Sequence, residues 1–391
     1  MRRILWSILA LLAGAAVAFF VFGPGIVERS LNRLEQAAHA PPSIRAQALH
    51  DQLLIADMHA DTLLWQRSVL KRSDRGHVDL PRLLDGNVAL QVFSSVTQSP
   101  QGLNYHSNDS DTDSLIGLAI VQRQPLATWR SKLARSLWHA RRLADAAAQH
   151  DQLMLVASRE DLQALLTARE RDPAVVGGML SIEGLHNLEG QRENLQLLFD
   201  VGYRMAGLTH FFDNEVAGSM HGLQKGGLTP FGREIVMDME SIGMLVDIAH
   251  LSDAAVSEVL AMASRPVVVS HGGVRALCDS NRNLTDEQLR GVAATGGLIG
   301  IGYWSGAVCA TTPSAVAAAI RYAADVAGVA HVGLGSDYDG AVLVSFDTSD
   351  LVLVTDALLA EGFSESEIRL IMGGNLIRLL LSTLPNADPA P

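Results

Sequence analysis

Eight short apolar runs, separated by stretches with helical periodicity, most strongly constrain the fold of this chain. Most of these runs are continuous in hydrophobicity rather than alternating, which is typical of parallel strands buried on both faces. Eight such strands with intervening helices in about 340 residues predict a (β/α)₈ barrel of the TIM type. A doubly wound parallel sheet is the alternative fold. The expected strands cover residues 53–59, 88–96, 178–184, 204–210, 243–250, 266–271, 296–303 and 331–337.

Helical patterns lie between these strands, and several begin beside a residue whose side-chain oxygen can cap a first turn. We expect helices at residues 160–170, 230–242, 253–263 and 286–294. Their expected caps are Ser158, Thr229, Ser252 and Thr285. The polar segment 98–114 breaks this rhythm and precedes a long helical stretch through Arg142. It predicts an extended loop with its own helices, and loops at this end of a barrel commonly cover the active site.

One long apolar segment lies at the N-terminus. Arg2 and Arg3 precede residues 4–22, which carry no charge and would span about 28 Å as a helix, close to the hydrocarbon thickness of a bilayer. A cleaved signal peptide would use the small residues at 16–18 as its cleavage site. We favour an uncleaved transmembrane anchor, because the apolar run continues past that site to Phe22. The two arginines then stay in the cytoplasm, and the bulk of the chain is periplasmic or extracellular.

The domain organisation follows from these features. We expect an anchor or signal at 1–25, a linker at 26–45, the barrel at 46–385 and a tail at 386–391. The formal net charge is −12, and no run of Lys and Arg supplies the clustered basic surface that nucleic-acid binding needs. We therefore expect no nucleic-acid partner. A homodimer is one candidate assembly, and the sequence leaves the oligomeric state open.

Imidazoles and carboxylates gather at the C-terminal ends of the expected strands, which open together on one face of a barrel. Histidine ends four of the eight expected strands. An acidic residue lies at or close to the end of three strands, of which only the first also ends in histidine. These residue types, converging from separate strands, are the ligands expected for zinc or a similar divalent ion. The residues are His59, His210, His250, His271, Asp61, Glu183 and Asp337.

His59 and Asp61 lie two residues apart on a strand, so their side chains face the same way and can hold one ion. Asp57 faces the same way and is expected to support them. Glu183 ends an apolar strand, where a carboxylate is costly to bury unless it is paired or bound to metal. It can bridge two cations. The alternatives are a hydrogen-bonded core histidine for His59 and an arginine partner for Glu183.

His250 and His271 end neighbouring strands about 5 Å apart, so together they can hold one ion. Two unrelated core histidines are the alternative. Asp337 is well placed to take a proton from water and pass it to a leaving amine. Asp339 competes for that role, although it is equally suited to cap the turn before Gly340.

His210 is expected to polarise a substrate carbonyl or to stabilise an oxyanion, with metal binding as the alternative. From its position alone, Arg282 is expected in a surface salt bridge, although its planar guanidinium suits a substrate carboxylate. We also assign Tyr303, at the end of the seventh strand, to the substrate-binding set. His186 receives no role but is the first to reconsider. The histidines expected at the surface are His39, His50, His139 and His150.

Taken together, these motifs resemble the membrane (renal) dipeptidases of the amidohydrolase-like metal-dependent barrels. The resemblance runs from about Leu54 to about Leu380, and the motifs are specific only as an ordered set. They are Asp57-x-His59-x-Asp61, Ile182-Glu183-Gly184, Leu208-Thr209-His210, Asp247-x-x-His250, Ser270-His271, Asn281-Arg282-Asn283 and Gly335-Ser336-Asp337-Tyr338-Asp339-Gly340.

The resemblance implies two zinc ions, with His59 and Asp61 on the first, His250 and His271 on the second, and Glu183 bridging them. It implies that His210 and Arg282 bind the substrate and its tetrahedral intermediate and that Asp337 is the acid/base residue. The implied reaction is hydrolysis of dipeptides, including L,D-dipeptides, by a metal-activated bridging hydroxide. Another amidohydrolase activity, such as deaminase, lactonase or β-lactam hydrolysis, is the alternative. A catalytically silent metal-binding protein is a third reading.

The chain departs from the family in places. Met58 and Ala60 stand where many members have Gly and Asn, and an N-terminal helix replaces the C-terminal lipid anchor of animal members. Family members often bridge cysteines placed like Cys278 and Cys309, so the resemblance implies a disulfide, which an exported domain permits. Two free thiols are the alternative.

Overall fold

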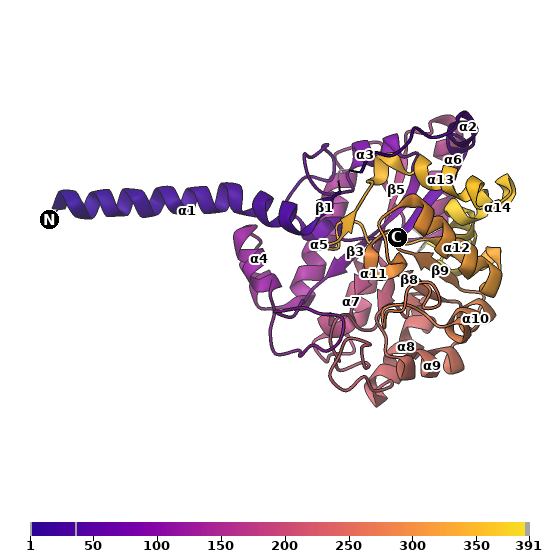
Figure 1. Cartoon of the computed structure of the whole chain (residues 1–391). Helices are drawn as coiled ribbons and strands as arrows, with labels where there is room; N and C mark the ends of the chain where they lie inside the picture. The colour runs from indigo at the N-terminus through magenta and orange to yellow at the C-terminus, as the bar shows by residue number, and fades with distance from the viewer. Residues whose placement is uncertain (1, 36, 388–391) are drawn as a thin grey trace.

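The computed structural model describes residues 2–35 and 37–387, and its centre is a closed barrel of parallel strands surrounded by helices (Figure 1). The strands follow the order β3-β2-β10-β9-β8-β7-β6-β5, and a pairing between β3 and β5 closes the ring. The predicted (β/α)₈ barrel is therefore confirmed over the doubly wound alternative. The barrel strands are β2 (Ile55–Ala60), β3 (Val88–Val96), β5 (Val176–Glu183), β6 (Tyr203–Gly207), β7 (Leu245–Asp247), β8 (Val267–Gly272), β9 (Leu298–Ile301) and β10 (Val332–Leu334).

The barrel strands are buried on both faces, as their continuous hydrophobicity predicts. Every residue of β3 and β5 is buried, and Phe93 pairs with Leu180 in their shared register. A short additional strand, β4 (Leu153–Leu155), pairs with β5 outside the ring. Gly335 directly follows β10, where a Cβ atom would lie 2.0 Å from the Ser270 carbonyl oxygen. Only glycine therefore fits this junction, which lies two residues before Asp337.

Helices cover the outside of the barrel, and the four expected ones agree with the structure to within one residue at each end. Each begins at its expected cap, whose side-chain oxygen accepts a hydrogen bond from the first turn. The helices are α1 (Arg2–Leu31), α2 (Ile44–His50), α3 (Leu80–Asp85), α4 (Leu115–Val121), α5 (Lys132–Ala147), α6 (Arg159–Arg171), α7 (Asn194–Asp200), α8 (Pro230–Ile242), α9 (Asp253–Met262), α10 (Asp286–Ala294), α11 (Ser305–Val308), α12 (Pro313–Ala327), α13 (Val352–Ala360), α14 (Glu365–Arg369) and α15 (Asn375–Thr383).

An insertion joins β3 to α5, as the polar segment predicts. Residues 97–114 form an irregular loop, and α4 and a single turn of 3₁₀ helix at Leu126–Trp129 follow it. The insertion is tied to the barrel by an ion pair between Arg135 and Asp113 at 2.6 Å. Arg135 also donates to the carbonyl oxygens of Thr97 and Thr128.

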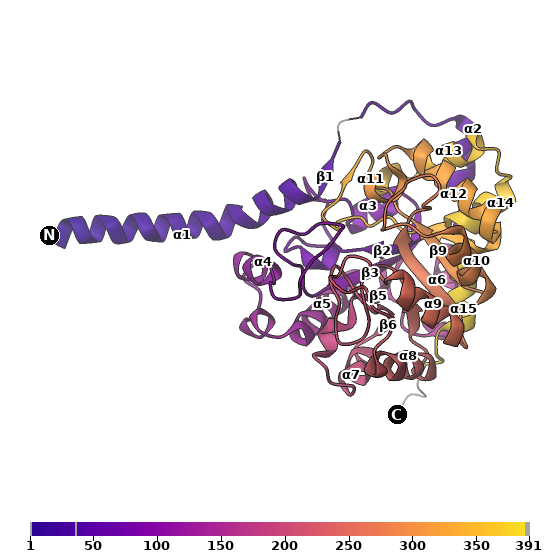
Figure 2. The same cartoon turned by 60° about the horizontal axis from the view of Figure 1, so that its bottom comes forward.

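The N-terminal helix α1 projects away from the barrel over most of its length (Figures 1 and 2). Among the described residues it is the one helix long and apolar enough to cross a membrane, and no residue of its apolar stretch is buried. The helix continues past the expected boundary at residue 25 to Leu31. There the buried Glu28 pairs with Arg67 at 2.6 Å and with Arg75 at 2.7 Å.

The segment expected as a linker is also attached to the barrel domain. The short strand β1 (Arg33–Leu34) pairs in parallel with β11 (Leu343–Val344), in the loop that follows β10. Asn32 accepts a hydrogen bond from the Ala341 amide at 2.9 Å. Residues 32–34 therefore contact the same loop that carries Asp337.

Two histidines expected at the surface are buried, which corrects that expectation. His50 contacts the Thr355 hydroxyl at 2.8 Å, and His139 contacts the Ser95 hydroxyl at 2.8 Å. Burial lowers the pKa of His50 to about 4 and that of His139 to about 3, so both rings are neutral in the folded chain at pH 7. His39 and His150 are half-buried.

Candidate active site

The acidic and imidazole side chains singled out in the sequence meet at the C-terminal ends of the barrel strands. His59 and His271 lie within β2 and β8, and Glu183 is the last residue of β5. His210 and His250 lie three residues beyond the ends of β6 and β7. Asp337 likewise lies three residues beyond β10, so these expected strands were too long at their C-terminal ends.

Two of these loop residues adopt a left-handed backbone conformation that non-glycine residues rarely take. The φ angle is +65° at His250 and +58° at Asp337. Such a conformation costs roughly 1–2 kcal/mol per residue and persists only where surrounding contacts enforce it. The His250 carbonyl oxygen accepts from the Met220 amide at 2.9 Å and from the Thr209 hydroxyl at 3.2 Å. These contacts hold the strained turn that brings the imidazole into the cluster.

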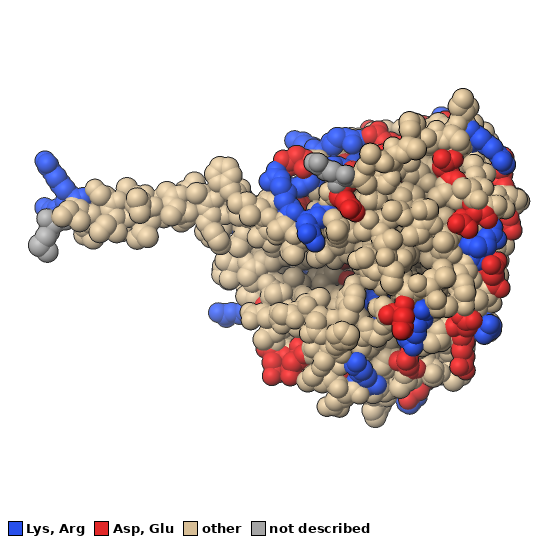
Figure 3. Space-filling view, viewed as in Figure 1, with Lys and Arg blue, Asp and Glu red and all other residues tan. Residues whose placement is uncertain are grey.

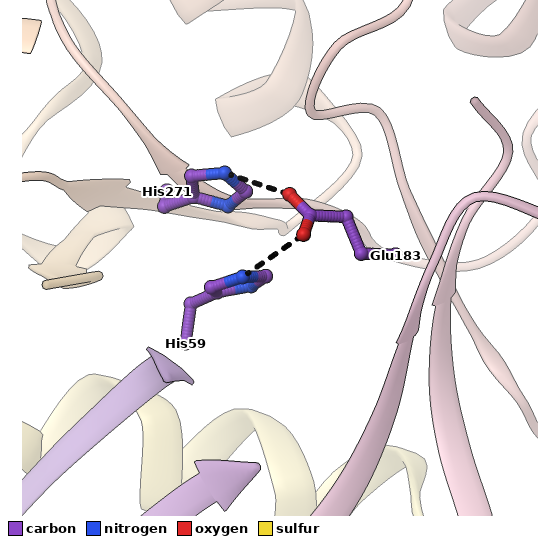
Figure 4. A group of neighbouring side chains, drawn as sticks. All are labelled: His59, Glu183 and His271. Carbon is purple, nitrogen blue, oxygen red and sulfur yellow. Dashed lines mark ion pairs between the residues drawn. The ribbon is translucent and has the colours of Figure 1, made fainter. Parts of the chain in front are cut away.

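Glu183 lies between two groups of imidazoles. Its Oε1 atom is 2.8 Å from His250 Nε2 and 3.2 Å from His271 Nε2. Its Oε2 atom is 3.7 Å from His59 Nε2, so the two oxygens of one carboxylate face different histidines (Figure 4). The His210 Nε2 atom is also 3.6 Å from Oε1.

Two aspartates complete the opposite side of the cluster. Asp61 Oδ1 is 3.6 Å and Asp337 Oδ1 is 3.9 Å from His59 Nε2. The described residues thus form three overlapping groups of possible metal ligands, and within each group all ligand atoms lie within 4.8 Å of one another. The groups are His59 with Glu183 and His271, Glu183 with His210 and His250, and His59 with Asp61 and Asp337.

Two further buried aspartates tie neighbouring strand ends together beneath the cluster. Asp57 accepts hydrogen bonds from the backbone amides of His59 at 3.0 Å and Ser336 at 2.9 Å. Asp247 accepts from the amides of Ala249 at 3.0 Å and Ser270 at 2.9 Å. The expected supporting role of Asp57 therefore acts on the backbone of His59 rather than on its ring.

Asp339, the competitor of Asp337, points into a different environment. It accepts from the Thr62 hydroxyl at 2.8 Å and the His77 amide at 2.7 Å, and it forms an ion pair with Arg67. The Arg67 cation lowers the pKa of Asp339 despite the opposing effect of burial. Asp339 is thus a fully paired carboxylate and does not belong to any of the three ligand groups.

Burial and mutual attraction act in opposite directions on the protonation of the cluster. Burial by itself would raise the pKa of Glu183, but His210 and His59 hold that pKa well below its usual range. Burial would lower the pKa of His59, whereas Glu183 and Asp61 raise it well above its usual range. The pKa of Asp337 is raised, first by burial and then by the neighbouring Glu183 and Asp61 carboxylates. The neighbouring carboxylates of Glu183, Asp61 and Asp337 therefore concentrate negative charge in the cluster, which favours the binding of a cation.

The donor atoms fit a divalent metal ion. Both ring nitrogens of His59 and the Oδ1 atom of Asp61 are buried without a hydrogen-bond partner among the described residues. A buried polar atom without a partner costs about 1–3 kcal/mol, so such atoms call for a ligand. Imidazole nitrogens and carboxylate oxygens are the ligand types that zinc and similar ions take in proteins.

Arg282 lies beside the imidazole side of the cluster and is buried, contrary to the surface position expected from sequence alone. It donates to the His271 carbonyl oxygen at 2.8 Å and lies over the Trp304 ring at 5.6 Å. Among the described residues, no carboxylate forms an ion pair with its guanidinium. Burial lowers the pKa of Arg282, and the nearby Asp337 opposes that change.

The other two assigned residues differ in their surroundings. Tyr303 is fully buried, with its ring against Tyr338 and Phe346 and its hydroxyl without a partner among the described residues. Its contact with substrate stays a prediction. His186 bonds to the Thr97 hydroxyl at 2.8 Å and belongs to none of the ligand groups.

Tyr105 is a residue of the site that sequence reasoning missed. It comes from the insertion after β3, and its hydroxyl accepts from Trp304 Nε1 at 2.8 Å. Its ring stacks on Phe211 and His221, with centroids 5.9 and 5.4 Å away. An aromatic residue within a polar loop was the only signal in the sequence. The expected covering loop thus reaches the loops after β6 and β9.

A disulfide joins Cys278 to Cys309, which lie in the loops after β8 and β9. The bond spans 31 positions of sequence and closes the same segment that carries Arg282. No free cysteine remains, because the chain contains only these two.

Comparison with known proteins places this site in context. The family model described as membrane dipeptidase (peptidase family M19) matches residues 44–388. Among curated proteins, dipeptidase aclJ of Aspergillus oryzae is 34% identical over 53% of this chain and 52% of its own length. Dipeptidase verJ of Clonostachys rogersoniana is 33% identical over 52% of this chain and 55% of its own length. The chain thus spans about half the length of these curated relatives.

Solved structures show the same fold at lower sequence identity. A metallopeptidase from Rhodobacter sphaeroides, bound to a phosphinate mimic of L-Ala-D-Ala, superposes with a TM-score of 0.69 at 21% identity. The match covers 85% of this chain and 99% of that one. The probable dipeptidase PvdM from Pseudomonas aeruginosa gives a TM-score of 0.72 at 19% identity, covering 87% of this chain and 97% of the other.

Proposed function

Because this chain belongs to the membrane dipeptidase family, peptidase family M19, we propose that it hydrolyses the peptide bond of dipeptides. The observation that carries the proposal is the position of Glu183. Its two oxygens face His59 on one side and the pair His250 and His271 on the other. One carboxylate placed between two groups of imidazoles is the arrangement expected of a ligand that bridges two metal ions.

We propose that the metal is zinc and that two ions are held. His59 and Asp61 would hold one, His250 and His271 the other, and Glu183 would contact both. Metal ions in such a site supply Lewis acidity, which lowers the pKa of water and polarises a carbonyl group. The remaining chemistry falls to side chains around the cluster.

Asp337 is proposed to move the proton. Its carboxylate lies 3.9 Å from His59 Nε2 and belongs to the ligand group of His59 and Asp61, so it would lie beside a water bound within that group. It would accept a proton from the water and deliver it to the leaving amine nitrogen. His210, beside Glu183, would donate a hydrogen bond to the carbonyl oxygen as that oxygen becomes negative.

Arg282 is proposed to recognise the carboxylate of the substrate and the charge of the tetrahedral intermediate. A buried guanidinium without a carboxylate partner among the described residues is costly unless an anion binds it. Its planar fork suits a carboxylate. The substrates would therefore be small peptides with a free C-terminal carboxylate near the scissile bond. L,D-dipeptides belong among them, since the R. sphaeroides neighbour binds a mimic of L-Ala-D-Ala.

We further propose that α1 remains as a transmembrane anchor, with the barrel periplasmic or extracellular. Arg2 and Arg3 precede the apolar run, and positive charge at that end favours the cytoplasmic side. The other end of α1 is bonded to the barrel through the buried Glu28. The anchor thus continues into the folded domain.

A substrate panel tests the proposed activity. The purified full-length chain, supplied with zinc, is assayed against L,L- and L,D-dipeptides, the matching dipeptide amides and the matching tripeptides. We expect dipeptide hydrolysis, with kcat/KM at least about 10-fold lower for the amides because these lack the carboxylate partner of Arg282. Turnover of lactones or amino-substituted bases, with dipeptides left intact, would replace the dipeptidase proposal by another amidohydrolase activity.

A further inference from the structure

Helix α4 presents an apolar surface that the proposed reaction does not use. Its seven residues, Leu115–Val121, contain no polar side chain, yet only Leu115 and Ala119 are buried. Ile116 is 39% exposed, and Leu126, in the turn that follows, is 71% exposed. We refer to Ile116 and Leu126, which are exposed, together with the half-buried Leu118, Ile120 and Val121 as the α4 patch. Isolated exposed apolar residues are common, but a contiguous group points to a partner.

The α4 patch lies beside the N-terminal helix. In both views of the fold, α4 is next to the base of α1, on the side of the body from which α1 projects (Figures 1 and 2). The two helices touch, because a Cβ atom added at Gly23 would lie 3.2 Å from Val121 Cγ1. The patch is therefore continuous with the surface of α1.

The contact occurs where α1 would leave the hydrocarbon of a membrane. The continuous apolar run of α1 ends at Phe22, and Gly23 follows it by one residue, about 1.5 Å along the helix axis. The first charged residue after the run is Glu28, about 8 Å beyond Gly23. Val121 thus lies at the depth of the boundary between acyl chains and headgroups. Gly25, two residues further on, faces the guanidinium of Arg75, a group suited to the headgroup layer.

The charges around the patch suit the same position. Arg123 and Arg130, between and after the two apolar pieces, are both exposed. Long basic side chains bordering an apolar surface reach the lipid phosphates while the apolar residues enter the acyl boundary. Figure 3 shows the flank of the body under α1 as largely uncharged, with a basic side chain projecting from it and a group of acidic side chains further below.

We propose that the α4 patch rests in the interfacial layer of the bilayer that α1 crosses, as a second, monotopic membrane contact. The inference rests on the anchor proposed for α1. One helix joined to a domain leaves that domain free to tilt, whereas a second contact fixes the orientation of the barrel. The same insertion carries Tyr105 and Gln98 against the site, and the Gln98 carbonyl oxygen lies 3.4 Å from His210 Nδ1. The membrane contact would thus hold the segment that borders the site.

Lipid depth measurements on the full-length chain test this contact. Because Cys278 and Cys309 are bonded to each other, a single introduced cysteine is the only free thiol for an environment-sensitive fluorophore. The test positions are Leu126→Cys and Ile116→Cys. The matched control is Met237→Cys on α8, which is 54% exposed, and the anchor reference is Leu12→Cys, which is 58% exposed. The vesicles contain phosphatidylcholine with a minority of phosphatidylglycerol and a lipid quencher placed near the headgroups or deep in the acyl region.

We expect the label at Leu126 and Ile116 to be quenched by the shallow quencher at least about three-fold more than the label at Met237, since interfacial elements lie within 5–10 Å of the headgroup boundary. We expect the label at Leu12 to respond to the deep quencher. Quenching at Leu12 together with control-level quenching at the two patch positions would overturn the patch and leave the anchor standing. Absence of quenching at Leu12 would overturn both. Patch labels shielded from water but not quenched by lipid would point to a second copy of the chain and also overturn the membrane contact.

Discussion

The two halves of the site are supported by different interactions. The carboxylate half, with His59, Asp61 and Asp337, borders a buried network in which Arg67 joins Asp339 to Glu28 of α1. The imidazole half, made of His250 and His271, is contacted by Arg282, which lies in the loop that the Cys278–Cys309 disulfide closes. Glu183 is the residue that contacts both.

This difference assigns separate tasks and separate vulnerabilities to the two halves. The carboxylate half contains Asp337 and is linked through ion pairs to the end of the N-terminal helix, so it should govern proton transfer and depend on that helix. The imidazole half carries Arg282 on a covalently closed loop, so it should govern substrate binding and depend on the oxidation state of the cysteines. The following predictions test whether the halves separate in this way.

Replacing Asp337 with Asn should have the largest effect. The side chain keeps its size but no longer accepts the proton, so kcat should fall by about 10²–10⁴-fold while KM and metal content change little. Steady-state kinetics and metal analysis on the same preparation measure this. Full activity in the variant would remove Asp337 from proton transfer and end the assignment of that task to the carboxylate half.

Removal of the disulfide should act on the imidazole half. For a loop of 31 residues, the double variant Cys278→Ser/Cys309→Ser should unfold with a free energy about 3–4 kcal/mol lower in the chain-entropy model. Because Arg282 lies within the closed loop, KM should rise more than kcat falls. Chemical denaturation and kinetics provide the measurements. A selective loss of kcat would contradict the separation of the halves.

Asp339→Asn is the matched partner of the Asp337 variant, two residues away. It leaves Arg67 buried with Glu28 as its remaining carboxylate partner, so the free energy of unfolding should fall by about 3 kcal/mol. The value of kcat should fall less than about 10-fold, well below the effect of acid/base loss. If Asp339→Asn reduced kcat as strongly as Asp337→Asn without loss of stability, the two aspartates would need to exchange roles.

Loss of activity at low pH can come from unfolding of the whole domain rather than from either half of the site. The buried His139, outside the site, measures one contribution to that unfolding. Its pKa is about 3 in the folded chain, against an ordinary value of 6.5. Between these values the unfolded chain binds an extra proton, so the free energy of unfolding decreases as pH falls below 6.5. At pH 5 this amounts to about 2 kcal/mol. Between pH 7 and pH 5, the free energy of unfolding should decrease in the parent chain by about 2 kcal/mol more than it does in His139→Gln. If the stability of the parent chain and of His139→Gln changed equally with pH, protonation of His139 on unfolding would not be a source of the acid sensitivity.

Most of the barrel could be predicted from sequence because its strands are buried on both faces. Continuous apolar runs located the centres of the strands, and caps such as Ser158 and Thr285 located helix starts. The cluster followed from the rule that strand ends share one face of a barrel. The family resemblance added the disulfide, and it implied substrate binding for Arg282, which position alone had placed in a surface salt bridge.

The features that sequence reasoning missed depend on contacts between distant segments. Nothing local shows that Glu28 is buried against Arg67, because that contact arises only after α1 meets the loop following β2. The left-handed backbone at His250 is enforced by Met220 and Thr209 from another loop. Tyr105 reaches the site through a loop without regular structure, for which no periodicity exists.

Metal stoichiometry tests the central claim, that Glu183 joins the two halves, most directly. The full-length chain and its Glu183→Gln variant are dialysed against zinc and analysed by mass spectrometry for bound metal per chain. We expect about two zinc ions in the parent chain and about one or fewer in the variant, whose amide cannot bridge two cations. Equal metal content in both proteins, or a single ion in the parent chain, would contradict the account.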